Sequence, residues 1–206
     1  MTTNKIVISN SGDNMEDAFA EVEKYADYQK VSHKTALHLR LLTEEAFGML
    51  REMVGSFTTY FYVDGDGRTN TLNIEGNADM DVWERSDLLS VSKSGKNVLA
   101  TGIMGKIRAV IEAGALGLEA GNGCEPLDYG YILSTAPMDA TTMSSTQFWS
   151  LSAYRDEIAK IKDEGEIPAK AWDELEKSIV ANLADDVQVG ILKGKIKLII
   201  TYKSKE

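Results

Sequence analysis

Apolar residues recur every three or four positions in two segments near the start of the chain, which predicts two amphipathic helices. The first helix is expected to begin at Ser11 or Asp13, both of which have side chains typical of a helix cap, and to run to about residue 30. Its apolar side carries Met15, Phe19, Val22 and Ala26. The second helix is expected over about residues 33 to 54, with Gly55 ending it. Its apolar side carries Leu39, Leu42, Ala46, Met49, Leu50 and Met53, and Arg40, Glu44 and Arg51 lie opposite.

Apolar and polar residues alternate in two further pairs of segments, which predicts two β-hairpins. In the first hairpin, residues 57–63 and 69–75 flank the turn Asp64-Gly65-Asp66-Gly67. In the second, residues 187–192 and 195–203 flank the turn Lys193-Gly194. The last strand carries apolar and aromatic residues on one side, namely Ile196, Leu198, Ile200 and Tyr202, and polar residues on the other, namely Lys195, Lys197 and Thr201.

The middle of the chain carries weaker patterns, and the elements expected there are less regular. They are, in order, a loop at 77–97 with a short helix at 82–89, a helix at 98–118, a Gly-rich loop at 117–126, a strand at 128–135, a short strand or helix lead-in at 146–152, and helices at 153–164 and 168–184.

Strands and helices gathered into separate runs predict an α+β fold. We expect a single domain over residues 1–206, built as a two-layer sandwich in which one mainly antiparallel mixed sheet is covered by helices on one face. Residues 119–185 are expected to add a mostly helical part before the closing hairpin. A chain of 206 residues with 43% hydrophobic residues is long enough to bury one proper core.

The composition argues against several classes of function. A formal net charge of −10 argues against nucleic acid as a partner, because such proteins need a concentrated basic face. The single cysteine, Cys124, excludes an internal disulfide, and with only His33 and His38 beside it there is no zinc-ligand set of usual spacing. No window approaches about 18 apolar residues, so we expect no membrane span and a cytoplasmic location.

Two adjacent carboxylates, Glu44 and Glu45, lie near the middle of the second predicted helix, and Met49 follows one turn after Glu45. The run LRLLTEEAFGML is similar to the first box, E-A-x-x-N, of the histidine-kinase-like ATPases, and GIMGKIRAVIEAGALG is similar to their glycine box. Over residues 11–118 and the closing hairpin, the chain thus resembles the GHKL superfamily (the Bergerat fold), and within it the small anti-sigma-factor serine kinases.

The resemblance implies a role for each matched position. Glu45 takes the place of the Glu that polarises the attacking water or hydroxyl, and Met49 takes the place of the Asn that holds Mg²⁺. A thioether sulfur is a soft, weak donor, whereas Mg²⁺ takes oxygen ligands. The family's next box, D-x-G-x-G, would start at Asp79, but Asp81 and Trp83 replace its glycines. We therefore interpret Met49 as a core residue and Glu45 as either a vestige of a catalytic residue or a solvated helix edge.

One candidate anion site is left, at the start of the later helix. Backbone N–H groups at Gly102 and Gly105 would lie at the positive end of that helix, with Lys96 and Lys106 adding charge and Asp79 nearby if nucleotide binding is retained. The same glycines equally fit close helix packing or a turn. The sequence argues against a true P-loop, because Ala100 and Ile107 replace its first glycine and its Mg²⁺-binding hydroxyl residue.

Two functions stay open at this point. The first is a regulatory or protein-binding module that has lost catalysis, needs no cofactor and no metal, and docks an unidentified protein partner, with a homodimer as one arrangement. The alternative is an ATP-binding serine/threonine kinase or ATPase of the anti-sigma-factor type, which uses ATP with Mg²⁺.

Overall fold

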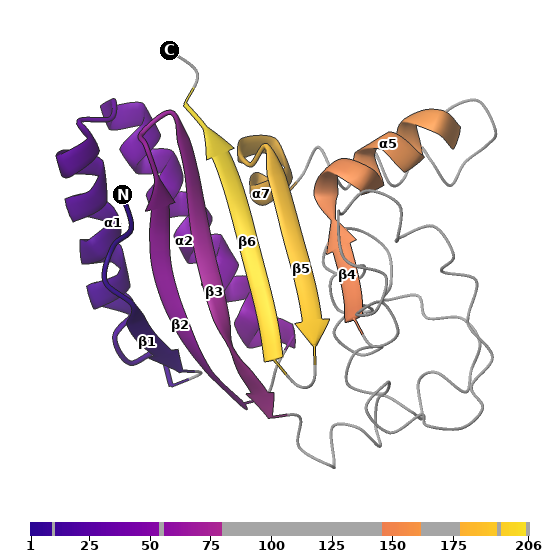
Figure 1. Ribbon diagram of the computed structural model, residues 1–206, viewed down its shortest axis with the longest axis horizontal. Coiled ribbons are helices and arrows are strands. Elements are labelled where there is room, and N and C mark those ends of the chain that lie inside the picture. Colours follow the sequence, from indigo (N-terminus) through magenta and orange to yellow (C-terminus); the bar gives the residue numbers. More distant parts are fainter. Residues whose placement is uncertain (10, 54–55, 80–145, 162–177, 193–194, 205–206) are drawn as a thin grey trace.

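Six strands form one antiparallel sheet in the computed structural model, which describes residues 1–9, 11–53, 56–79, 146–161, 178–192 and 195–204. The strand order is β1-β2-β3-β6-β5-β4 (Figure 1). The elements are β1 (Ile6–Ser9), α1 (Met15–Gln29), α2 (His33–Met53), β2 (Ser56–Gly65), β3 (Thr69–Asp79), β4 (Thr146–Ser150), α5 (Leu151–Ile161), α7 (Ile179–Leu183), β5 (Asp186–Leu192) and β6 (Lys195–Lys203).

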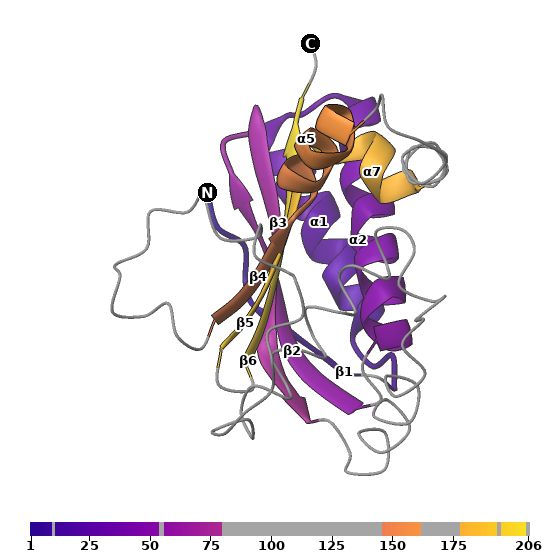
Figure 2. The ribbon, with the colours of Figure 1, turned by 90° about the vertical axis from the view of Figure 1, so that its right-hand side faces the viewer.

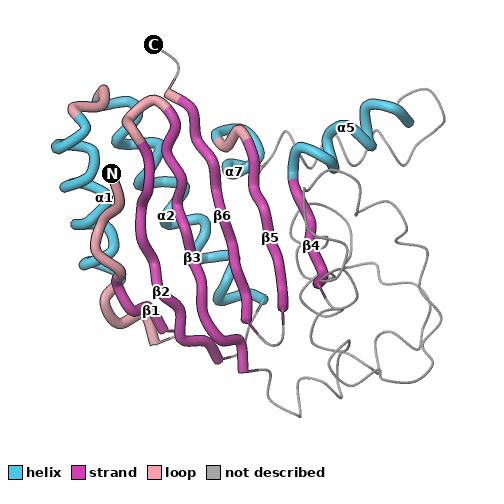
Figure 3. The backbone as a smooth tube through the Cα atoms, in the orientation of Figure 1, coloured by secondary structure: helices cyan, strands magenta, loops and turns pink. Residues whose placement is uncertain are grey.

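The described helices lie on one face of the sheet, so the molecule has two layers (Figure 2). Figure 3 shows the same division by colour, with the strands in one layer and α1, α2 and α7 behind it. The hydrophobic core fills the space between the layers. Its fully buried sheet residues include Phe61, Val63, Leu72, Val187 and Leu198. This arrangement confirms the predicted α+β class, the antiparallel pairing and the helical cover on one face.

Both predicted hairpins are present, with the predicted residues facing the core. Phe61 of β2 pairs with Ile74 of β3, and Ile74 pairs with Leu198 of β6. All three side chains are buried. Strict alternation predicts a strand well when one of its faces is covered, because a shift by one residue would expose every apolar side chain. The turn residues 193–194 lie outside the described residues.

Two strand features depart from the expectations. Strand β1 was not predicted, because a four-residue run, IVIS, is too short to show a period; it pairs with β2 through Val7 and Tyr60. Strand β3 continues to Asp79, although a loop was expected from residue 77. The segment 77–79 has no apolar alternation, but its backbone pairs with Ser56–Thr58 of β2, which holds it in the sheet.

The predicted cap of the first helix is wrong. The N-cap of α1 is Asn14, which has a left-handed backbone (φ 63°) and no side-chain cap bond. Its side-chain Nδ2 instead donates to the carbonyl oxygen of Val7 at 3.0 Å, and the hydroxyl of Ser11 donates to Asp13 Oδ2 at 2.5 Å. These polar groups therefore tie the β1–α1 connection together, and none of them caps the helix.

The segment 146–152 forms both of the structures that were left open for it. Residues up to Ser150 form β4, and α5 begins at Leu151, two residues before the helix expected at 153–164. The first turn of α5 is held by two side chains: Ser150 Oγ accepts from the Ala153 N–H at 3.3 Å, and Asp186 Oδ1 accepts from the Ser152 N–H at 2.9 Å. Such acceptors satisfy backbone N–H groups that have no partner within the helix.

The prediction of one continuous helix over residues 168–184 is wrong, because a new helix starts after Ser178. That residue has an extended backbone, and its side chain accepts from the Ala181 N–H at 3.2 Å, so α7 begins at Ile179. A serine that caps a helix start competes with helix continuation.

Several other predictions lie outside the described residues: Gly55, the loop from residue 80 to 97 with its helix at 82–89, the helix at 98–118, the loop at 117–126 and the strand at 128–135.

Candidate functional site

Helix α2 lies against the covered face of the sheet and contacts both α1 and α7. Its predicted apolar side is confirmed where the side chains are described, because Leu39, Leu42, Ala46 and Leu50 are fully buried. The residues predicted to lie opposite are exposed: Arg40, Glu44 and Arg51. The helical phase of the sequence therefore placed the candidate residues of this helix correctly.

Met49 is a core residue, as predicted. Its side chain is 5% exposed and belongs to the same buried cluster as Leu50 and Phe61. A buried thioether packs well among apolar groups and offers only a weak, soft donor to a metal. The position at which the resemblance implies an Mg²⁺ ligand therefore contributes to packing.

Glu45 lies at the border between the buried and exposed sides of α2. Its side chain is half-buried, whereas the side chain of Glu44 is exposed. Within the part of the chain that the structure describes, the Glu45 carboxylate forms no hydrogen bond and no ion pair. Mg²⁺ is usually held by one or two carboxylates together with waters and substrate phosphates, so this carboxylate by itself is not a complete Mg²⁺ site.

Gly48 leaves the surface next to these carboxylates open. It is exposed, and a Cβ atom built on it would meet no atom of the described residues within 4 Å. We call the surface formed by Glu44, Glu45 and Gly48 the Glu45 face; Met49 follows Gly48 in the sequence but belongs to the core. Among the described residues, no group of three or more His, Cys, Asp or Glu side chains is close enough to hold a metal ion.

The other sequence-predicted site residues are not brought to the Glu45 face by the described part of the chain. Only the backbone of Asp79 is described, at the end of β3, where it pairs with Ser56. The remaining candidates lie outside the described residues: Asp81, Lys96, Gly102, Gly105, Lys106 and Cys124. Of the predicted site residues, the structure thus describes the side chains of Glu45 and Met49, one turn apart on α2, and the anion site stays a prediction.

A second polar region, which was not predicted, lies between α1, the β2–β3 turn and the end of β6. The buried hydroxyl of Tyr25 donates to Asn70 Oδ1 at 2.7 Å. The amide Nδ2 of Asn70 donates to the Gly67 carbonyl at 3.3 Å and to the Tyr202 carbonyl at 3.4 Å, and Ser204 Oγ donates to the same Gly67 carbonyl at 2.7 Å. Burial raises the pKa of Tyr25, and the carboxylates of Asp66 and Asp64 raise it further.

His38 joins this region to the first turns of α2. Its Nδ1 lies 3.0 Å from the hydroxyl of Tyr202, and the two rings meet edge to face with their centroids 5.5 Å apart. Burial lowers the pKa of His38, and the nearby Lys34 ammonium lowers it further. We call Tyr25, Asn70, His38, Tyr202 and Ser204 the junction cluster.

The hydrogen bonds of the junction cluster join α1, α2, β3 and the residues at the end of β6. Tyr25 donates to Asn70, Asn70 and Ser204 donate to backbone carbonyls, and the Tyr202 hydroxyl pairs with His38 Nδ1. One signal in the sequence could have found it: Asn70 has the same phase in β3 as the core residues Leu72 and Ile74. A polar residue in an apolar phase needs a buried hydrogen-bond partner.

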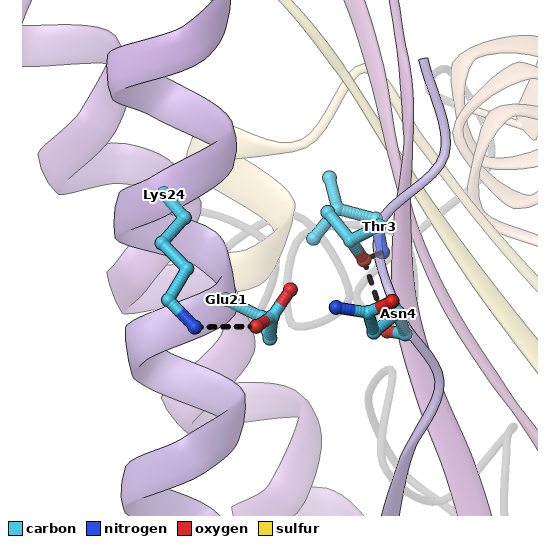
Figure 4. A network of polar contacts seen from close by, with 5 residues as sticks. Thr3, Asn4, Glu21 and Lys24 are labelled. Carbon is cyan, nitrogen blue, oxygen red and sulfur yellow. Dashed lines mark hydrogen bonds and ion pairs between the residues drawn. The ribbon is translucent and has the colours of Figure 1, made fainter.

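A buried carboxylate on α1 also has a structural role (Figure 4). Glu21 forms an ion pair with Lys24, one turn along the helix, with Lys24 Nζ 2.7 Å from Glu21 Oε1. Figure 4 shows that the Glu21 side chain points toward Asn4, in the segment that precedes β1. The hydrogen bond from Lys24 to Glu21 raises the pKa of that lysine. The Glu21 carboxylate therefore points from α1 toward the N-terminal segment, and the largely exposed Lys24 reaches it from the solvent side.

The face of the sheet opposite the helices is polar with a few large side chains. Val7 and Tyr60 are cross-strand partners there, 41% and 48% exposed. Lys5 forms an ion pair with Glu75 and lies 4.7 Å from the ring centroid of Tyr62. These residue types are usual on a solvated face of an antiparallel sheet.

Comparison of the chain with protein-family models, with curated proteins and with solved structures found no significant match. No helix among the described residues combines the length and the apolar character that crossing a membrane requires.

Proposed function

We propose that the chain is a regulatory, protein-binding module on a histidine-kinase-like ATPase (GHKL) fold that has lost catalysis. The order of its elements supports this proposal. A helix that carries Glu45 precedes the β2–β3 hairpin, and a second hairpin, β5–β6, completes the sheet beside β3. This order is the one that the resemblance implies, with helices on one face of an antiparallel sheet.

The burial of Met49 is the single observation that carries the loss of catalysis. In the family that the chain resembles, an Asn at this position holds Mg²⁺ through its side-chain oxygen. Here a thioether, 5% exposed, points into the core. Without a fixed metal, nothing at this position neutralises the phosphates of a nucleotide, and the half-buried Glu45 adds negative charge beside them.

One observation favours the alternative, an ATP-dependent serine/threonine kinase or ATPase. The Glu45 carboxylate has no partner among the described residues, and the helix surface beside it at Gly48 is open. A general base needs such an unpaired carboxylate within reach of the proton that it takes. Under this alternative, Mg²⁺ would be held by the nucleotide and by residues other than Met49.

Calorimetric titration with ATP and ADP, each with and without Mg²⁺, separates the two functions. The binding module predicts no Mg²⁺-dependent affinity tighter than about 0.1 mM, equivalent to roughly −5.5 kcal/mol. Tighter binding that requires Mg²⁺ would favour the enzyme instead, and phosphate release that is lost in a Glu45→Gln variant would identify Glu45 as its general base. A Glu44→Gln variant is the matched control, because Glu44 is the exposed neighbour on the same helix.

A further inference from the structure

We draw no further inference here: the strongest candidate, the sheet face opposite the helices around Val7, Tyr60 and Tyr62, is an unpartnered surface, and nothing in the structure shows what covers it.

Discussion

The junction cluster and the Glu45 face differ in whether their polar groups have hydrogen-bond partners, although helix α2 contributes to both. At the junction cluster, buried polar atoms have partners at hydrogen-bond distance, such as Tyr25 with Asn70 and His38 with Tyr202. At the Glu45 face, a half-buried carboxylate has no partner among the described residues, and its neighbour one turn on is the apolar Met49.

This difference shows which of the two regions the fold depends on. A buried polar group without a partner costs about 1 to 3 kcal/mol, so a satisfied cluster is needed for stability once its residues are present. A carboxylate at a helix border can remain solvated, so its removal costs little. We therefore expect the junction cluster to contribute more to stability than the Glu45 carboxylate, whereas Met49 contributes as part of the core.

The largest effect is expected for Met49→Asn. The substitution removes a buried apolar side chain and places a carboxamide in the core, which should lower the free energy of unfolding by about 2 to 4 kcal/mol. Met49→Leu is the matched control, with an expected loss under about 1.5 kcal/mol. Urea unfolding and phosphate-release assays measure both stability and activity. An Asn variant that kept its stability and gained Mg²⁺-dependent turnover would show that residue 49 lies in a working site.

A smaller loss is expected for Tyr25→Phe in the junction cluster. This substitution removes the hydroxyl that Asn70 accepts from and leaves Asn70 Oδ1 buried without that donor, at a cost of about 1 to 2 kcal/mol. Tyr28→Phe is the control, because Tyr28 is 71% exposed. Urea melts of the two variants should differ clearly. Equal stabilities would mean that the cluster contributes little to the fold.

A pH dependence should follow from His38. Its pKa in the folded protein lies below the ordinary value of 6.5, so the unfolded chain takes up this proton more readily. The stability that the neutral ring provides is present above pH 6.5 and is lost as the pH falls through that value toward the lower, folded pKa. Unfolding midpoints between pH 8 and pH 5 measure it. His38→Gln should flatten this part of the curve, and an unchanged slope in the variant would assign the effect to other groups.

The smallest effect is expected at Glu45. Because its carboxylate has no partner among the described residues, Glu45→Gln should change the free energy of unfolding by under about 0.5 kcal/mol. Denaturant melts against Glu44→Gln give the comparison. A loss of several times that size would reveal a buried, paired carboxylate and would remove the contrast with the junction cluster.

Local patterns predicted the parts of the fold in which one face is covered. Alternation placed the two hairpins, and helical phase placed Met49 inside the core and Glu45 at its border. Strand β1 was not predicted, because four residues are too few to show an alternation of apolar and polar positions. The junction cluster was missed for another reason: the phase of Asn70 indicates that it needs a buried partner, but its contact with Tyr202 spans 132 positions of sequence, and no local pattern identifies that partner. Lys96, Gly102, Gly105 and Lys106 lie outside the described residues, so their part in a site is still a prediction.

Paramagnetic Mn²⁺ tests the central claim most directly, namely that no metal is held beside Glu45 and Met49. Mn²⁺ accepts the same oxygen ligands as Mg²⁺, and it broadens the NMR signals of amides that lie close to it. With ATP and Mn²⁺ added, we expect the amides of residues 45–49 to keep the same relative intensity as those of Glu16 and Asp17, which are exposed acidic residues in the first turn of α1. Selective broadening of residues 45–49 that disappears in Glu45→Gln would contradict the account and place a metal at this face.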